Sequence, residues 1–99
     1  MSSSTVLKDK SKIKIKEPKK YKVIMHNDDF TPMDFVTYIL ENIFNKSEQD
    51  AFNIMMSVHN SGKAVVGIYS YDMAKTKTEL AMGIAREEGF PFKITVEEE

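Results

Sequence analysis

Three short runs rich in β-branched, aromatic or alternating apolar residues restrict the folds open to this chain. Residues 21–25 and residues 64–69 are two of these runs, and their composition is typical of strands. In residues 92–96 apolar and polar side chains alternate, which predicts a strand with one buried and one wet face. The three runs together indicate a small sheet.

Between the runs, apolar side chains recur at helical spacing in residues 35–44, 51–59 and 72–88. The resulting order is β-α-α-β-α-β. It predicts an α/β (α+β) fold in which a three-stranded antiparallel sheet packs on helices. A chain of 99 residues can bury one modest core but not two, so a single domain is expected. We expect its core to comprise residues 19–99.

Local signals mark the expected ends of the helices. Thr31 is the expected N-cap of the first helix, with Pro32 at the first helical position, and Ser47 is the expected N-cap of the second. Gly62 and Gly89 are expected to end the second and third helices, because glycine adopts the left-handed conformation that favours a helix stop.

Two further expectations concern packing. Gly67 interrupts the second apolar run and is expected to mark a bulge or a close approach of neighbouring groups. The third helix is expected to turn Met73, Leu80 and Ile84 inward, together with neighbouring alanines.

Residues 1–18 are rich in serine and lysine and contain no aromatic residue. Too few apolar groups are present there to offset the entropy lost on ordering, so a flexible N-terminal tail is expected. The alternation in residues 13–16 leaves open a strand that docks on a sheet edge.

Composition excludes several classes of function. The 14 basic and 15 acidic residues give a net charge of −1, so no nucleic-acid or anionic-membrane partner is expected. No run approaches the ~18 apolar residues of a membrane span, which favours a cytoplasmic protein. The chain has no cysteine, which excludes disulfides, thiolate catalysis and cysteine-ligated zinc.

A polar junction, Asn27-Asp28-Asp29, separates the first expected strand from the first expected helix. Asparagine and aspartate at such junctions commonly accept hydrogen bonds from nearby backbone N–H groups, which would be a structural role. The alternative is a receptor for a cationic group, with an amide oxygen and carboxylates at the rim of an apolar surface. The residues alone leave both interpretations open.

A metal-dependent enzyme is a competing hypothesis. His26, Asp28, Asp29 and His59 offer nitrogen and oxygen ligands, although their spacing matches no specific metal motif. No nucleophile elbow and no glycine-rich phosphate loop is present in the sequence. We therefore expect no catalytic residue and no cofactor, with the small metal-dependent enzyme kept as the alternative.

Three stretches resemble the signatures of one family, the ClpS adaptors of the Clp protease. They are residues 27–36 (Asn-Asp-Asp-Phe-Thr-Pro-Met-Asp-Phe-Val), residues 58–64 and residues 74–77, and the resemblance covers residues 20–97. It implies a core like the C-terminal domain of a ribosomal stalk protein. It also implies a monomeric, non-enzymatic adaptor for N-degron peptides and proteins, the substrates of the N-end rule. Such an adaptor would deliver them to a Clp AAA+ unfoldase, of the ClpA or ClpC type, for degradation.

The resemblance also implies roles for particular residues. Asn27, Asp28 and His59 would bind the free α-amino group of the substrate. Asp72 and Lys77 would contact the unfoldase. The pocket for the first side chain and its support would comprise seven further residues: Asp29, Thr31, Pro32, Met33, Met55, Val58 and Phe92.

The chemistry of these residues agrees with such a role. A terminal ammonium has three donors and one charge, and an amide oxygen, a carboxylate and a neutral imidazole supply three acceptors. Burying a leucine or phenylalanine side chain contributes about 1.5–3 kcal/mol. Neither contribution alone offsets the several kcal/mol that association costs. We therefore expect a ligand to need both a free N-terminus and a bulky first residue (Leu, Phe, Tyr or Trp).

Overall fold

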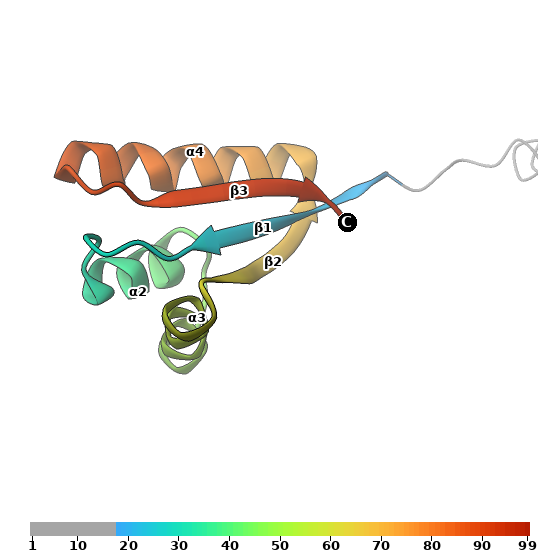
Figure 1. Cartoon of the computed structure of the whole chain (residues 1–99). Helices are drawn as coiled ribbons and strands as arrows, with labels where there is room; N and C mark the ends of the chain where they lie inside the picture. Colours follow the sequence, from blue (N-terminus) through green and yellow to red (C-terminus); the bar gives the residue numbers. More distant parts are fainter. Residues whose placement is uncertain (1–17) are drawn as a thin grey trace, which may run out of the picture.

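The computed structural model describes residues 18–99. The expected tail, residues 1–18, lies outside the described residues except for Pro18, as does the alternative strand at residues 13–16. The elements are, in order, β1 (Lys20–His26), α2 (Met33–Asn42), α3 (Glu48–Ser61), β2 (Lys63–Ser70), α4 (Tyr71–Glu88) and β3 (Lys93–Glu98) (Figure 1). The predicted β-α-α-β-α-β order is confirmed. Among residues 18–99, no helix has the length and apolarity that crossing a membrane requires.

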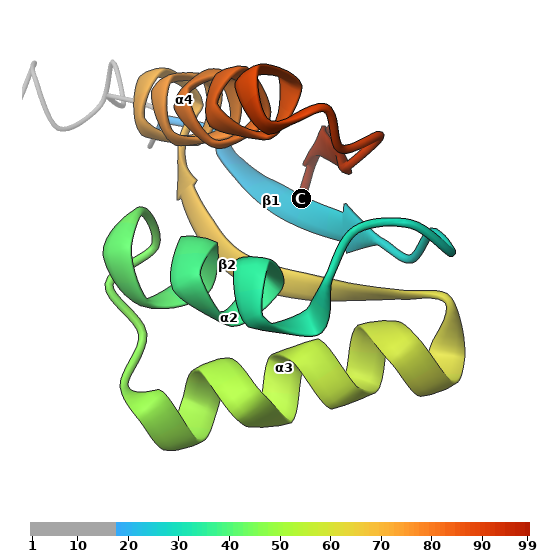
Figure 2. The ribbon, with the colours of Figure 1, turned by 90° about the vertical axis from the view of Figure 1, so that its left-hand side faces the viewer.

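The three strands form one antiparallel sheet in the order β2-β1-β3. The helices lie in a layer in front of the strands in Figure 2, with α4 along one side and the α2–α3 pair along the other. Val23 and Met25 of the central strand are completely buried beneath this layer. On the opposite face of the sheet, Val65 and Ile68 remain 46% exposed. The predicted fold, a three-stranded antiparallel sheet packed on helices, is confirmed.

The ends of α3 and α4 follow their local sequence signals. The hydroxyl of Ser47 accepts a hydrogen bond of 3.1 Å from the backbone N–H of Asp50, which caps α3. Gly62 (φ 90°) and Gly89 (φ 80°) close α3 and α4 in the left-handed conformation. These three predictions are confirmed.

The start of α2 differs from the prediction. Pro32 occupies the N-cap position, and no side chain caps the helix. The hydroxyl of Thr31 instead donates a 2.8 Å hydrogen bond to the carboxylate of Asp28. The predicted Thr31 cap is therefore wrong, because α2 begins one residue later than expected and Thr31 precedes the cap position.

The inward face of α4 matches the expectation only in part. Ala81 and Ala85 are completely buried, and Ile84 is partly buried and packs against the core. Met73 is 49% exposed and Leu80 is 51% exposed, so these two predictions are wrong. The buried stripe of α4 consists of small residues at spacings of four, three and four: Ala74, Thr78, Ala81 and Ala85. Small side chains let α4 lie close to the sheet, and this position leaves Met73 and Leu80 outside.

Gly67 lies at an irregularity of the sheet, as expected. Val23 pairs with Gly67 and Ile24 pairs with Val65, so Val66 is one residue in excess in β2. A Cβ atom on Gly67 would lie 2.7 Å from the hydroxyl oxygen of Tyr69, closer than real Cβ atoms come. The position therefore combines a bulge with a close approach.

Candidate functional site

A pocket of about 210 Å³ lies where β1 ends, between the polar junction, the start of α2 and the last turns of α3. Polar groups form one part of its lining and apolar side chains the other. The lining residues are Asn27, Asp28, Asp29, Thr31, Met33, Val36, Met55, Val58 and His59. Eight of these nine residues are among those singled out in the sequence, so the fold brings them together from three segments of the chain.

The backbone ties the polar junction to the end of α3. The N–H of Asn27 donates a 2.9 Å hydrogen bond to the carbonyl of Gly62, the residue that closes α3. His59 lies one helical turn before Gly62, so this bond brings the imidazole to the same rim as Asn27 and Asp28. Asn27 and His59 are both exposed. Neither side chain hydrogen-bonds to any other residue within 18–99, which leaves their acceptor atoms available.

Asp28 organises the junction. One carboxylate oxygen, Oδ1, accepts hydrogen bonds from the N–H groups of Phe30 (2.8 Å) and Thr31 (2.7 Å), and Oδ2 accepts the Thr31 hydroxyl (2.8 Å). Two carboxylate oxygens together offer about four acceptor positions, so about one remains on Oδ2. The carboxylate is therefore held in one orientation with room for one more donor.

The charge of Asp28 is stabilised by the same bonds. Partial burial by itself raises the pKa of this carboxyl, but the hydrogen bonds from Thr31 and Phe30 outweigh that effect. The net result is a pKa below its ordinary value of 3.8. The pocket rim consequently carries a fixed negative charge at neutral pH.

The apolar part of the pocket has a closed floor and an open mouth. Met55 and Val58 of α3 are 6% and 4% exposed, and Val36 of α2 is 8% exposed. Met33 is 46% exposed and stands at the mouth. Val36 does not stand out in the sequence as a pocket residue, although it follows Met33 by one helical turn, a spacing that places both on one side of α2.

Two residues expected at the pocket lie elsewhere. Phe92 is 6% exposed in the core, where its ring centroid is 5.9 Å from that of Phe35, and it is not among the lining residues. Pro32 is exposed and faces a neighbouring hollow instead. Phe92 immediately precedes β3 and is two residues from the buried Ile94, so the alternation that buries Ile94 also directs this ring into the core.

The residues expected at the unfoldase interface lie on α4, away from the pocket. Asp72 is exposed in the first turn of α4. The ammonium of Lys77 donates a 2.9 Å hydrogen bond to the carbonyl of Ile43 and lies 5.8 Å from the ring centroid of Tyr69. Lys77 therefore joins α4 to the end of α2 and is only partly available to a partner.

The metal-site alternative is not supported. Nε2 of His26 lies 2.8 Å from the hydroxyl oxygen of Thr95 on β3, and His26 does not line the pocket. Partial burial, and then the charges of Lys93 and Lys63, lower the pKa of this imidazole, with an opposing effect of Glu97. In the part of the chain that the structure describes, no three His, Cys, Asp or Glu side chains gather as metal ligands would.

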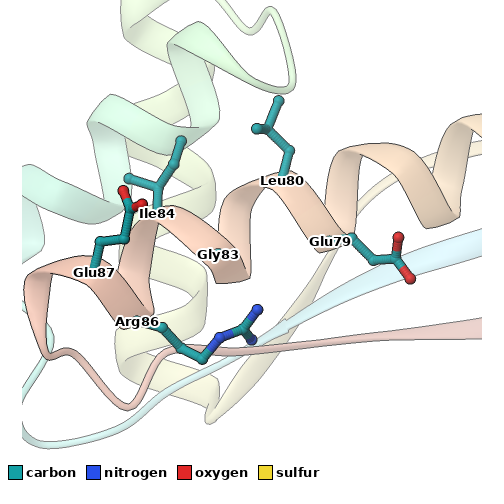
Figure 3. A pocket seen from close by; sticks show the side chains of 6 residues that line it. All are labelled: Glu79, Leu80, Gly83, Ile84, Arg86 and Glu87. Atoms are coloured by element: carbon teal, nitrogen blue, oxygen red, sulfur yellow. The ribbon is translucent and has the colours of Figure 1, made fainter.

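A larger depression of about 540 Å³ lies on the outer face of α4. Figure 3 shows Leu80 and Ile84 directed to one side of it and Glu79 and Arg86 to the other, with Gly83 between them. All of its lining residues come from one helix, and its charged groups have opposite signs. We regard the smaller pocket as the candidate site, because polar groups from three segments converge there over an apolar floor.

The fold and this pocket define the protein as a small α/β domain with a polar-rimmed apolar pocket. Comparisons with known proteins give the family. Residues 16–95 match the family model described as ATP-dependent Clp protease adaptor protein ClpS.

Curated relatives and a solved structure agree. The chain is 46% identical to the Acetivibrio thermocellus ClpS adapter protein over 99 residues, all of both chains. It is 51% identical to that of Treponema denticola over 81 residues, which cover 82% of this chain and 80% of the relative. The solved structure of Agrobacterium tumefaciens ClpS2 bound to L-phenylalaninamide superposes with a TM-score of 0.81 at 43% identity, covering 84% of this chain and 100% of that one.

This protein therefore belongs to the ClpS family of ATP-dependent Clp protease adaptor proteins. The predicted family is confirmed. Its role in proteolysis is that of an adaptor of the Clp protease.

Proposed function

We propose that this protein binds substrates through a bulky hydrophobic N-terminal residue and delivers them to a Clp AAA+ unfoldase for degradation. The observation that carries the proposal is the pocket at the end of β1. It places the side chains of Asn27, Asp28 and His59 on one rim above an apolar floor.

The rim suits a protonated α-amino group. The amide oxygen of Asn27, the free acceptor position of Asp28 and an imidazole nitrogen of His59 are three acceptors for the three N–H donors of an ammonium. Charge-assisted hydrogen bonds of this kind contribute roughly 1.5–3 kcal/mol each. Asp28 is already oriented by Phe30 and Thr31, so little further ordering is needed when a ligand binds.

The floor suits an apolar first side chain. Met55, Val58 and Val36 are nearly buried and offer an apolar surface, while Met33 at the mouth can adapt its flexible side chain. The ligand of the Agrobacterium relative, L-phenylalaninamide, has a free α-amino group and an aromatic side chain. A compound of this type presents both features that the pocket recognises.

Delivery requires a second surface, and we place it on α4. Asp72 is exposed at the start of this helix, and the partly buried Lys77 lies on the same element.

Residues 1–18 would engage the translocation channel of a ClpA- or ClpC-type unfoldase. Removing residues 1–18 should leave peptide affinity unchanged and impair degradation of a Leu-initiated substrate. Lost peptide affinity in that deletion would contradict this division of roles.

The proposal excludes catalytic turnover by the protein itself, and it needs neither a cofactor nor a nucleic-acid or membrane partner. It is compatible with a monomer in the cytoplasm. A metal-dependent enzyme, in contrast, would require His26 and His59 to bind the same metal ion, but His26 contacts Thr95 and only His59 lines the pocket.

A peptide panel tests the proposed function directly. The peptides share one sequence and differ only in the first residue, and each is prepared with a free and with an acetylated N-terminus. Free Leu, Phe, Tyr and Trp peptides should bind in fluorescence anisotropy, while the acetylated ones should not, because acetylation removes the charge and a donor. Equal affinity of both forms would identify a general protein-interaction module instead.

A further inference from the structure

A second hollow, of about 440 Å³, lies beside the candidate pocket. It is formed by the start of α2 and the end of α4 with the loop that follows, and Figure 1 shows these two helix ends at the same end of the molecule. Its lining residues are Pro32, Asp34, Phe35, Tyr38, Glu88 and Phe90. It thus combines aromatic rings with two carboxylates.

The rings form a connected apolar surface. The ring centroid of Phe35 is 4.9 Å from that of Phe90, in an edge-to-face arrangement, and 6.5 Å from that of Tyr38. Phe35 and Phe90 are partly buried, whereas Tyr38 is 51% exposed. The face of an exposed tyrosine ring attracts a cation placed over it.

The two charged residues that line the hollow have the same sign. Asp34 lies in the first turn of α2, where its carboxylate offsets the positive helix end, and Glu88 is the last residue of α4, at a negative helix end. Arg86, the nearest cation along α4, belongs to the depression on the outer face of that helix (Figure 3). A positively charged side chain with an apolar stem is therefore the complement of this hollow.

The hollow and the candidate pocket share no lining residue, but they meet along a single segment. Thr31 and Met33 line the pocket, while Pro32 and Asp34 line the hollow. The Cα atoms at the two ends of this four-residue segment are at most about 11 Å apart, since consecutive Cα atoms are about 3.8 Å apart. A bound chain that leaves the pocket past Met33 covers the same distance within three residues.

From this arrangement we propose that the hollow is a second subsite for the same ligand, which takes a lysine or arginine side chain at the third or fourth position of the bound peptide. The subsite rests on the proposed binding of N-termini, because the first residue in the pocket sets the position of those that follow. The protein would thereby bind more tightly those peptides that carry a cationic side chain downstream of the N-terminal residue.

The test uses the full chain and Leu-initiated peptides of one length. Lysine is placed at the second, third, fourth or fifth position, and glutamine at the same position is the reference. Lysine at the third or fourth position should bind about three- to tenfold more tightly than glutamine, a range set by an exposed ion pair with a cation–π contact. The double variant Asp34→Asn/Glu88→Gln should lose this preference and keep the affinity for the glutamine peptide.

Matched variants separate the subsite from general attraction between charges. Glu48→Gln/Glu79→Gln removes the same charge from exposed positions outside the hollow and should keep the preference for lysine. Tyr38→Phe should also keep it, because the ring remains, while Tyr38→Ala should reduce it.

Three results would overturn the subsite alone, with binding of Leu-initiated peptides intact. They are equal affinities for lysine and glutamine at every position, a preference unchanged in Asp34→Asn/Glu88→Gln, and a preference lost equally in Glu48→Gln/Glu79→Gln. If no Leu-initiated peptide bound at all, the proposed function would fail and the subsite with it. The glutamine peptides therefore distinguish the two failures.

Discussion

Thr31 donates two hydrogen bonds to Asp28, one from its backbone N–H to Oδ1 at 2.7 Å and one from its hydroxyl to Oδ2 at 2.8 Å. The Thr31 side chain, the expected cap of α2, instead orients the carboxylate on the rim of the pocket. Both of the interpretations that the sequence leaves open for the junction fit this arrangement, because Asp28 satisfies backbone groups and still retains an acceptor for a ligand.

Asp28→Ala should weaken binding of a Leu-initiated peptide about 10- to 100-fold, the equivalent of one charge-assisted hydrogen bond. The fold should persist, because the freed N–H group of Phe30 is exposed and that of Thr31 is only partly buried, so water can reach them. Fluorescence anisotropy gives the affinity, and circular dichroism checks the fold. Unchanged affinity would show that Asp28 does not contact the α-amino group.

Thr31→Val should weaken peptide binding by a few fold, since it removes one of the bonds that orient Asp28 without changing the side-chain shape much. Thr31→Ser keeps the hydroxyl and is the matched control. Anisotropy titrations of the two variants measure the difference. If both variants bound like the unmodified protein, orientation of Asp28 by the hydroxyl would not matter for binding.

Met33→Ala should widen the mouth of the pocket and admit peptides that begin with isoleucine or valine, which the unmodified protein should reject. The resemblance to the ClpS adaptors implies that Met33 is a gate against β-branched first residues, whose side chains are stiff near the backbone and need room at the mouth. Met73→Ala, at a methionine that is exposed to a similar degree on α4, is the control. Continued rejection of Ile and Val by Met33→Ala would place the selective residue elsewhere.

Stability should depend on acid pH through Asp28. Because its pKa is lower in the folded state than its ordinary value of 3.8, the carboxylate stabilises the fold above that pH. This contribution should be lost as the pH falls from about 4 through the folded-state pKa. Thermal unfolding between pH 7 and pH 2.5 should show Asp28→Asn less stable than the unmodified protein at neutral pH.

The difference between the two proteins should shrink at the acid end of that range. A gap in melting temperature that stayed constant from neutral pH to the acid end would show that ionisation of Asp28 does not stabilise the fold.

Phe92→Leu should lower the free energy of unfolding by about 1 kcal/mol, as smaller side chains do in packed cores. It should leave the ranking of Leu, Phe, Tyr and Trp peptides unchanged, because Phe92 packs on Phe35 in the core and does not line the pocket. Chemical denaturation and the peptide panel measure the two effects. An altered ranking would indicate that the core transmits the change to the pocket floor.

Local signals in the sequence predict much of the structure. The β-α-α-β-α-β order follows from hydrophobic periodicity, and the ends of α3 and α4 follow from Ser47, Gly62 and Gly89. Each of these features depends on residues that are close in the chain, so no knowledge of packing is needed. The family signatures likewise point to the residues that form the rim, although the roles of Asn27, Asp28 and His59 in binding stay predictions.

Only the tertiary structure decided which side chains share an environment. It turned Phe92 into the core, joined Lys77 to the carbonyl of Ile43, and added Val36 to the pocket. It also left Leu80 exposed, because the small residues of α4 were the ones that fitted closely against the sheet. Periodicity states that a residue lies on one face of a helix or strand, but the partner of that face depends on how distant segments pack, and this is a property of the whole fold.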